Sequence, residues 1–223
     1  MDLVSHPVDP GRVTEDVTHE LYRRIVTRRL APGVRLKERQ LAEELGVSRT
    51  AIRDALTRLE QRRLVERYPN RGAEVVRLGR QEILHIYELR EVIEGLCVRL
   101  ATERSAAGAW DDLVELFGEP AERAIHAGDF DIYSDYLDRL QVRTIEAASN
   151  PVLADVMNGL ADRIAVLARR SILLPGRAHQ GLKVHRAVVI AISRGNADEA
   201  ERLKRQNLRD ARDALLKFEE YVL

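Results

Sequence analysis

The stretch "LGVSRTAIRDALTRLE", residues 45–60, combines a glycine turn, a helix start and an amphipathic helix. Ser48 is a favourable N-cap, because a serine hydroxyl accepts a hydrogen bond from a free backbone N–H of the first helical turn. The apolar residues of the helix share one face: Ile52, Ala55, Leu56 and Leu59. The neighbouring face carries guanidinium and hydroxyl groups: Arg49, Thr50, Arg53 and Thr57. The segment therefore predicts a helix with one face in the core and a basic face beside it.

The residues before this helix supply a second, shorter one. Leu41, Ala42 and Leu45 predict a helix over about residues 38–45, and Gly46 permits the tight reversal that follows. Two helices joined in this way are typical of a helix-turn-helix, whose second helix enters the major groove of DNA. Arginine can bind guanine O6 and N7 there, and threonine can bond to base edges or phosphates. The alternative is that the arginines, including Arg39 on the shorter helix, are ordinary solvated charges.

The flanking sequence completes a small domain. β-Branched residues around "PNRG" in "VERYPNRGAEVVRL", residues 65–78, predict a two-stranded hairpin with its tip near residues 70–72. Such a hairpin makes the module winged, because Gly72 lets the backbone approach a duplex and Arg71 can reach the narrower groove or a phosphate. An earlier helix is predicted to start at an N-cap on Thr14 and to stop at "APG", residues 31–33.

Charge and composition limit the function classes. Residues 1–78 hold 16 Lys+Arg and 12 Asp+Glu, and the rest of the chain holds 20 Lys+Arg and 24 Asp+Glu. A basic domain therefore precedes an acidic one. This balance favours a polyanion as the partner of the first domain. Because there is no long apolar run, no secretory signal and only one cysteine, Cys97, we expect a cytoplasmic protein without a membrane partner and with Cys97 in its core. No HExxH, GxSxG, phosphate-binding glycine loop or catalytic Cys/His pair is present, so no enzyme is predicted.

From Gln81 onward the pattern predicts helices only. Six segments are expected: 81–106, 110–127, 129–148, 151–174, 178–194 and 197–221. Asn150 is a good N-cap because Pro151 follows it at the first helical position. Gly118 and Pro120 are expected to kink or split the second segment.

The predicted fold is therefore mainly α, in two domains. Residues 1–78 form a winged helix-turn-helix with a small β-hairpin, preceded by a flexible tail over about residues 1–12. Residues 79–223 form an all-α bundle of about six helices.

The first domain resembles a known family. "VTHELYRRIVTRRLAPGVRLKERQLAEELGVSRTAIRDALTRLEQRRLVERYPNRGAEV", within about residues 14–77, is similar to the winged helix-turn-helix domain of GntR-type bacterial transcription regulators. The resemblance implies contacts of three arginines with phosphates and bases, and a wing tip that reaches the groove. With the helix start included, the predicted DNA-binding residues are Arg39, Ser48, Arg49, Thr50, Arg53, Arg71 and Gly72.

The helical part resembles the ligand-sensing domain of the FadR branch of that family over about residues 81–215. The similar segments are "YELREVIEGLCVRLA" (87–101), "EAASNPVL" (146–153) and "HRAVVIAISRGNADEA" (185–200). The resemblance implies a homodimer bound to double-stranded operator DNA, in most relatives a repressor, with a small-molecule effector such as an organic acid in the helical domain. It also places Arg90 near the effector; the alternative is an i, i+4 ion pair with Glu94.

Many such domains hold a divalent metal through one Asp and three His. Counted from the similar segments, these positions fall here on Leu137, Gln141, His185 and Asn207, so one ligand of four is present. We therefore expect no metal cofactor, and a polar effector cavity in which Gln141, His185 and Asn207 offer neutral hydrogen bonds. Three alternatives remain open: a metal site of Asp138 and His185 after a local helix adjustment, His185 as a satisfied core residue, and a DNA-binding protein that responds to no effector.

Overall fold

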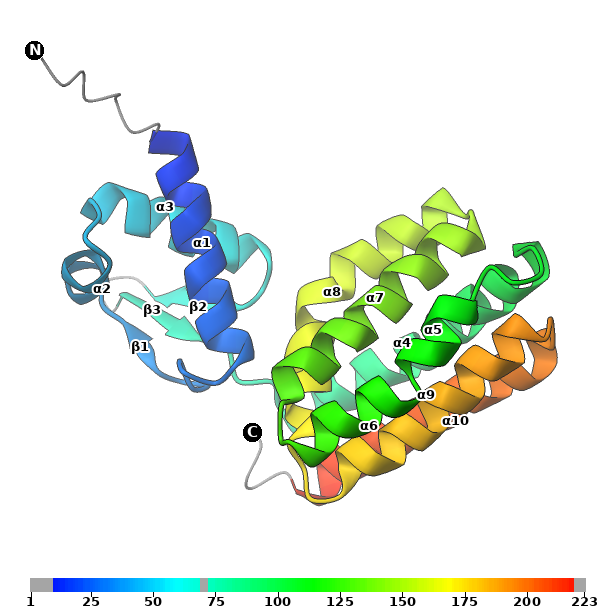
Figure 1. Cartoon of the computed structure of the whole chain (residues 1–223). Helices are drawn as coiled ribbons and strands as arrows, with labels where there is room; N and C mark the ends of the chain where they lie inside the picture. The colour runs from blue at the N-terminus through cyan, green and yellow to red at the C-terminus, as the bar shows by residue number, and fades with distance from the viewer. Residues whose placement is uncertain (1–9, 69–71, 219–223) are drawn as a thin grey trace, which may run out of the picture. The chain divides into compact units, whose positions relative to one another are not determined.

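The computed structural model describes residues 10–68 and 72–218, and it is mainly helical with a small sheet (Figure 1). Two compact units make up the chain, the first up to Arg77 and the second from Leu78 onwards apart from Asp162–Val166. The predicted fold class is confirmed.

The helix-turn-helix of the first unit follows the prediction. Its helices are α1 (Pro10–Val26), α2 (Glu38–Leu45) and α3 (Arg49–Gln61). Gly46 ends α2 with a φ of 66°, in the left-handed region that glycine adopts most easily. Ser48 then caps α3 by accepting a hydrogen bond from the Ala51 backbone N–H at 3.1 Å. The turn and the cap therefore stand where the sequence predicts them.

The apolar face of α3 is buried. Its four predicted residues, all with exposed fractions of 1% or less, are Ile52, Ala55, Leu56 and Leu59. The helix packs against α1, whose Leu21 is also fully buried. Each large apolar side chain buried in this way contributes roughly 2 kcal/mol. That burial fixes the rotation of α3 about its own axis and leaves the arginine face on the outside.

The start of α1 differs from the prediction. The helix begins at Pro10, and Thr14 lies inside it, where its carbonyl oxygen accepts a hydrogen bond from Thr18 Oγ1 at 2.7 Å. An N-cap at Thr14 is therefore wrong. The physical reason is that proline is well suited to the first helical position, where no N–H is needed, so the helix can start a turn earlier. Residues 10–12 of the predicted tail belong to α1, and the rest of that tail lies outside the described residues.

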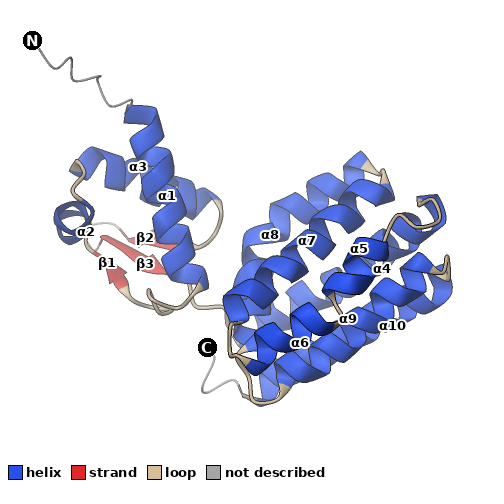
Figure 2. Ribbon diagram, in the orientation of Figure 1, coloured by secondary structure: helices blue, strands red, loops and turns tan. Residues whose placement is uncertain are grey.

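The sheet has one strand more than the predicted hairpin. Strands β1 (Arg35–Leu36), β2 (Val65–Tyr68) and β3 (Gly72–Val75) pair antiparallel in the order β1-β3-β2 (Figure 2). The hairpin register pairs Val65 with Val75 and Tyr68 with Gly72. Residues 69–71, which include Arg71, lie outside the described residues. β1 was not predicted because a strand of two residues is too short to leave an alternating pattern.

The second unit consists of helices only (Figure 2). They are α4 (Arg80–Arg104), α5 (Asp111–Leu116), α6 (Glu119–His126), α7 (Phe130–Ala148), α8 (Pro151–Ile172), α9 (Arg177–Ser193) and α10 (Ala197–Lys217). The expected split at Gly118 and Pro120 separates α5 from α6, so the described part of this unit has one helix more than the six predicted segments. Asn150 caps α8 by accepting from Leu153 N at 3.1 Å, as predicted. None of the described helices is long and apolar enough to cross a bilayer.

The second unit is built around α4 and α10. α10 packs against α4 and α9, and α4 also packs against α7. The largest buried side chains of the core between these helices include Trp110, Phe117 and Tyr133. Cys97 is buried, as predicted, and burial raises the pKa of its thiol to about 11. The thiol therefore behaves as a small core residue.

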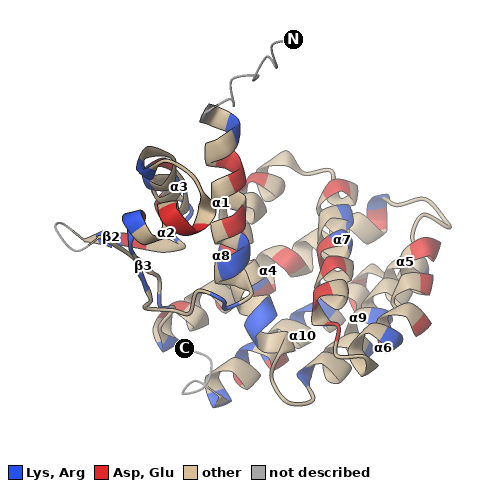
Figure 3. Cartoon of the chain, turned by 60° about the vertical axis from the view of Figure 1, so that its left-hand side comes forward, with Lys and Arg blue, Asp and Glu red and all other residues tan. Residues whose placement is uncertain are grey.

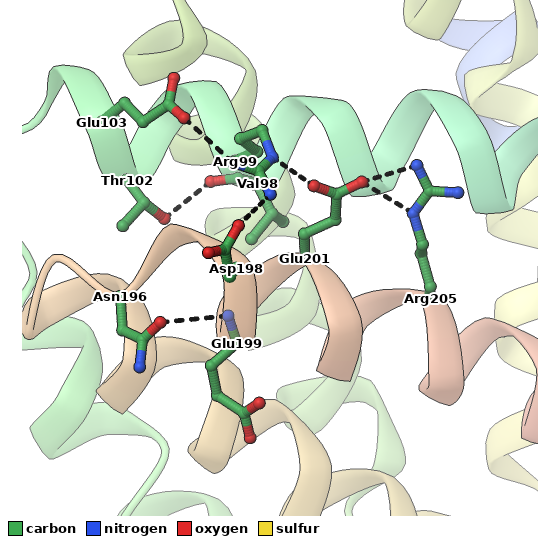
Figure 4. Close-up of polar contacts among 9 residues, drawn as sticks. All are labelled: Val98, Arg99, Thr102, Glu103, Asn196, Asp198, Glu199, Glu201 and Arg205. Carbon is green, nitrogen blue, oxygen red and sulfur yellow. Dashed lines mark hydrogen bonds and ion pairs between the residues drawn. The ribbon is translucent and has the colours of Figure 1, made fainter.

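An ion-pair network joins α4 to α10 (Figure 4). Arg99 of α4 donates to Glu201 and Asp198 of α10. Glu201 also accepts two hydrogen bonds from Arg205 on its own helix, at 2.6 and 2.9 Å. Glu201 is therefore shared by arginines of both helices, and the network links α4 to α10.

Candidate functional site

The N-terminal half of α3 presents a basic face. The side chains of Arg49 and Arg53 are 64% and 53% exposed, and Ser48 and Thr50 beside them are exposed as well. On α2, Arg39 is exposed and has a single loose ion pair with Glu43 at 3.7 Å. Figure 3 shows basic positions on α2, α3 and β2, with acidic positions of α2 among them.

One acidic residue organises this face. Glu38, the first residue of α2, accepts hydrogen bonds from Arg53 Nε at 3.2 Å and from Arg53 Nη2 at 2.9 Å. Its carboxylate also lies 3.9 Å from Arg49 Nη2 and 3.7 Å from Arg67 Nη2. The hydrogen bond from Arg53 is the main cause of the lowered pKa of Glu38, against a smaller opposite effect of burial. A carboxylate bound by two N–H groups holds the guanidinium in one plane, so Glu38 restricts the direction of Arg53.

The sheet contributes a further arginine to this face. Arg67 of β2 donates through Nη1 to Thr57 Oγ1 at 2.9 Å, and Thr57 Oγ1 donates to the Arg53 carbonyl at 3.0 Å. Neither Glu38 nor Arg67 was among the predicted site residues. Helical spacing shows which residues share a face of one helix, but it does not show which side chains of another element approach that face.

The predicted wing residues are only partly described. Gly72 begins β3 with a φ of 83°, which favours glycine, and it is exposed. Arg71 lies outside the described residues. The role of this hairpin in DNA contact therefore stays a prediction.

A second group of polar residues lies inside the helical unit. His185 of α9 places Nδ1 3.0 Å from Tyr133 Oη and Nε2 2.9 Å from Asn207 Nδ2. Asn207 in turn accepts from Arg177 Nη2, at 2.8 Å on Oδ1 and 3.1 Å on its backbone oxygen. The rings of Phe117 and Tyr133 flank the imidazole, with centroids 6.1 and 6.4 Å away. We refer to Tyr133, Arg177, His185 and Asn207 as the polar chain.

The direction of every hydrogen bond in the polar chain follows from Arg177. A guanidinium can only donate, so the Asn207 oxygen faces Arg177 and the Asn207 NH₂ group faces His185. Nε2 of His185 must then accept, and its proton lies on Nδ1, which donates to the Tyr133 oxygen. The hydroxyl hydrogen of Tyr133 is left to donate elsewhere.

Burial keeps His185 neutral. It lowers the pKa of His185 to about 3, and the positive charges of Lys204 and Arg177 add to this effect. Burial also lowers the pKa of Arg177, which remains charged because the ordinary pKa of arginine is so high. A protonated His185 would in addition turn an N–H toward the Asn207 NH₂ group, where no acceptor exists.

Arg90 takes part in a buried ion pair. Its Nε donates to Glu94 Oε1 at 2.6 Å, and Lys204 Nζ lies 2.7 Å from Glu94 Oε2. The Arg90 guanidinium also stacks over the Tyr87 ring at 4.6 Å. Burial raises the pKa of Glu94, but Arg90 and Lys204 outweigh it and hold that pKa at about 2. The i, i+4 pair of Arg90 with Glu94 is therefore formed, and an effector role of Arg90 stays a prediction.

The remaining predicted residues do not join the polar chain. Gln141 and Leu137 are half-buried on α7, and Asp138 is exposed on the same helix. In the part of the chain that the structure describes, no hydrogen bond connects Gln141 or Asp138 to His185. Nor do three His, Cys, Asp or Glu side chains of residues 10–68 and 72–218 gather at a point where a metal ion could bind.

Comparisons with known proteins identify the family. Residues 85–210 match the family model "FCD domain", and residues 13–75 match "Bacterial regulatory proteins, gntR family". The chain belongs to the gntR family and carries an FCD domain. The "Probable D-xylose utilization operon transcriptional repressor" of Paenarthrobacter nicotinovorans is 25% identical to this gntR-family chain, over 90% of this chain and 88% of that protein.

Two comparisons point to one further relative. The HTH-type transcriptional regulator McbR of Escherichia coli (strain K12) is 27% identical over 66% of each chain. The solved structure of E. coli McbR/YncC superposes with a TM-score of 0.76 and 21% identity, and the alignment covers 94% of this chain and 98% of that one. The relatives are transcription regulators, and the structural likeness extends the shared fold over both units.

The metal that the FadR-type resemblance implies does not fit these residues. Both ring nitrogens of His185 are already hydrogen-bonded, and the Asn207 oxygen is bound to Arg177. Leu137 offers no donor atom where the resemblance expects a carboxylate. A buried guanidinium two hydrogen bonds from the imidazole would also repel a cation. No step of the proposed function therefore involves a metal.

We predict that Glu38→Gln weakens the preference for specific DNA. The three arginines lose their shared carboxylate, so sequence discrimination should fall by on the order of 1 kcal/mol, while binding to random DNA strengthens because one negative charge is removed. Fluorescence anisotropy with operator and random duplexes over a salt series measures both effects.

Glu43→Gln is the matched control for this experiment. It removes the same charge from the same helix, at an exposed residue that pairs only loosely with Arg39. Equal loss of discrimination in the two variants would show that charge alone, and not the contacts of Glu38, explains the effect.

We predict that His185 makes stability depend on pH. Its pKa is about 3 in the folded state and about 6.5 when unfolded, so the unfolded chain binds a proton that the folded chain does not. The contribution of neutral His185 to the free energy of unfolding is complete above about pH 7. It falls by up to about 1.4 kcal/mol per pH unit as the pH drops from 6.5 toward 3. His185→Gln can accept from Asn207 and donate to Tyr133 without titrating, and should reduce this slope in urea unfolding at pH 7, 6 and 5.

His179→Gln, an exposed residue of the same helix, is the control and should keep the wild-type slope. Identical pH dependence in wild type and in His185→Gln would contradict a His185 that stays neutral in the folded chain.

Proposed function

We propose that this protein is a sequence-specific DNA-binding transcription regulator, a homodimeric repressor that a small-molecule effector releases from its operator. The observation that carries the proposal is the exposed basic face of α3, held against a buried apolar face on the same helix. Such a helix can enter a major groove without changing its packing.

The contacts of Arg53 suggest how α3 reads a base. Glu38 binds Nε and Nη2 of Arg53, and Nη1 stays available to an acceptor on DNA. Arg49 has only a distant ion pair with Glu38, at 3.9 Å, so its guanidinium is free to form a bidentate contact with guanine. The N-terminus of α3, next to Ser48, adds backbone N–H groups that favour a phosphate.

An exposed apolar stripe on α4 supports the dimer. Leu89, Val92 and Leu96 recur at helical spacing and are 43%, 53% and 39% exposed. A two-fold axis brings the same stripe of two copies together, so the stripe of one copy can pack against the identical stripe of the other. A dimer would also present two copies of α3 to two half-sites of a pseudo-palindromic operator.

The polar chain supports an effector in the second unit. Burying polar and charged groups is costly even when they are hydrogen-bonded, and here the buried Arg177 and Asn207 lie beside the half-buried His185 inside the helical unit. A ligand that binds one conformation better than another shifts the balance between them, and so changes operator affinity. The rival function is a DNA-binding protein with no effector, whose polar chain would be structural only.

We predict that Arg49→Ala and Arg53→Ala each weaken binding to the operator by about 1–3 kcal/mol, because each removes a base or phosphate contact. Selection of bound duplexes from a random library gives the operator, and anisotropy titration then gives the affinities. Thermal unfolding should change little, since both side chains are exposed.

Arg58→Ala provides the control on the same helix. Arg58 is exposed but lies five residues beyond Arg53, on a different side of α3. Wild-type affinity in the Arg49 and Arg53 variants would exclude α3 as the reading helix.

We predict that Val92→Glu converts the dimer to a monomer of 25.3 kDa, because a buried carboxylate on each copy would face its symmetry mate. Multi-angle light scattering over a concentration series measures the mass. Val142→Glu is the matched control: Val142 is 54% exposed, on α7, and its variant should remain dimeric. A dimeric Val92→Glu would place the interface elsewhere.

A further inference from the structure

Three arginines of the first unit share the carboxylate of Glu38, and they approach its two oxygens differently. Glu38 Oε1 accepts from Arg53 Nε at 3.2 Å and lies 3.7 Å from Arg67 Nη2. Glu38 Oε2 accepts from Arg53 Nη2 at 2.9 Å and lies 3.9 Å from Arg49 Nη2. Arg53 therefore binds both oxygens, while Arg67 and Arg49 each lie beside one of them.

Arg67 differs from the other two arginines in its surroundings. Its side chain is 33% exposed, against 64% for Arg49 and 53% for Arg53. Its Nη1 donates to Thr57 Oγ1 at 2.9 Å, and the same hydroxyl donates to the Arg53 carbonyl at 3.0 Å. Arg67 of β2 is therefore attached to the turn of α3 that carries Arg53, with its Nη2 beside Glu38.

The charge of Arg67 acts on Glu38. The hydrogen bond from Arg53 is the main cause of the lowered pKa of Glu38, against the opposite effect of burial. Of the other two arginines, Arg67 lowers this pKa by its charge more than Arg49 does. The Glu38 side chain is only 20% exposed, and a carboxylate in such surroundings is costly unless cations or N–H groups lie around it. Since Arg49 is free to contact guanine under the proposed function, Arg67 is the cation that stays beside Glu38 when DNA is bound.

An ion pair between two flexible side chains does not by itself set a direction. Arg53 and Glu38 can move together, because each has several rotatable bonds and fixing them costs conformational entropy. Arg67 adds a fixed point, since Thr57 binds one end of its guanidinium and the other end lies beside Glu38. A side chain that reads a base is placed accurately only when the residues behind it are themselves held by hydrogen bonds.

Resting on the proposed function, we propose that Arg67 is a positioning residue for sequence readout: it fixes the Glu38 carboxylate, and Glu38 in turn directs Arg53 toward a base. Arg67 itself makes no contact with DNA in this role, because its Nη1 donates to Thr57 and its Nη2 lies beside Glu38. The direction of Arg53 on α3 then depends on where the sheet holds β2. The reading helix and the hairpin are thereby coupled through one carboxylate.

The first experiment measures sequence discrimination, which is the ratio of the dissociation constants for random and operator duplexes, on the full-length protein at one salt concentration. Arg67→Gln should lower this ratio by about fivefold, and by no more than Glu38→Gln does, because it acts through Glu38. Arg58→Gln removes the same charge from a different side of α3 and should leave the ratio unchanged. A wild-type ratio in Arg67→Gln overturns the proposal.

The second experiment separates positioning from direct contact with DNA. In the Glu38→Gln background, Arg67→Gln should change the ratio by less than about twofold, because the carboxylate that Arg67 fixes is already absent. A base contact of Arg67 would instead lower the ratio equally in both backgrounds. A phosphate contact would reduce the slope of log affinity against log salt by about 0.9 more than Arg58→Gln does. Either of these two results overturns the proposal.

Thr57→Val tests the same positioning without changing a charge, and it decides the matter if Arg67→Gln does not fold. It removes the hydroxyl that binds Arg67 and keeps a branched side chain of similar shape. The ratio should fall in the otherwise wild-type protein and stay constant in the Glu38→Gln background. An unchanged ratio in the first case, or an equal fall in both, contradicts the positioning role.

Arg49→Ala, measured in the same titrations, separates this inference from the proposed function. If Arg49→Ala weakens operator binding but Arg67→Gln keeps the wild-type ratio, the proposed function stands and the positioning role of Arg67 fails. If the wild-type protein prefers no duplex over random DNA, the proposed function fails and this inference fails with it.

Discussion

Arginine donates hydrogen bonds, never accepts them and stays charged at any physiological pH, and this constraint decides how two groups of residues are arranged in this chain. On the outside of the first unit, Arg53 requires an acceptor and finds the carboxylate of Glu38. Inside the second unit, Arg177 finds only the oxygens of Asn207. From that one donor the orientation of the Asn207 amide, the tautomer of His185 and the free hydroxyl hydrogen of Tyr133 all follow.

Arg53 is bound by a carboxylate and Arg177 by neutral oxygens. The two side chains also differ in their exposure to water. Arg53 is half-exposed, so its ion pair with Glu38 contributes little to the free energy of unfolding. The main effect of this ion pair is to orient the Arg53 side chain. Arg177 is buried, where water does not screen it and an unpaired charge is costly. An exposed arginine can exchange Glu38 for DNA at little cost. The buried Arg177 is bound instead by the two neutral oxygens of Asn207.

The sequence predicts the first unit well because its signals are local. Helical spacing and the preference of serine and glycine for helix ends are enough to place α2, the turn at Gly46 and the buried face of α3. The prediction fails where a residue depends on a distant element. Glu38 and Arg67 join the α3 face from α2 and β2, and Tyr133 of α7 reaches His185 of α9 from a position far away in the chain. Counting from the segments that resemble the family predicted that His185 and Asn207 lie together, and they are hydrogen-bonded. The count could not show that the Arg177 guanidinium binds the oxygen of the same Asn207 amide.

The polar chain lies where the FadR-type resemblance implies a metal site. The metal site that the FadR-type resemblance implies needs three neutral imidazoles and one carboxylate. Here Leu137 stands where the resemblance expects the carboxylate, and Arg177 places a positive charge two hydrogen bonds from His185. Under the proposed function, an effector that binds one conformation of this unit better than another would change operator affinity.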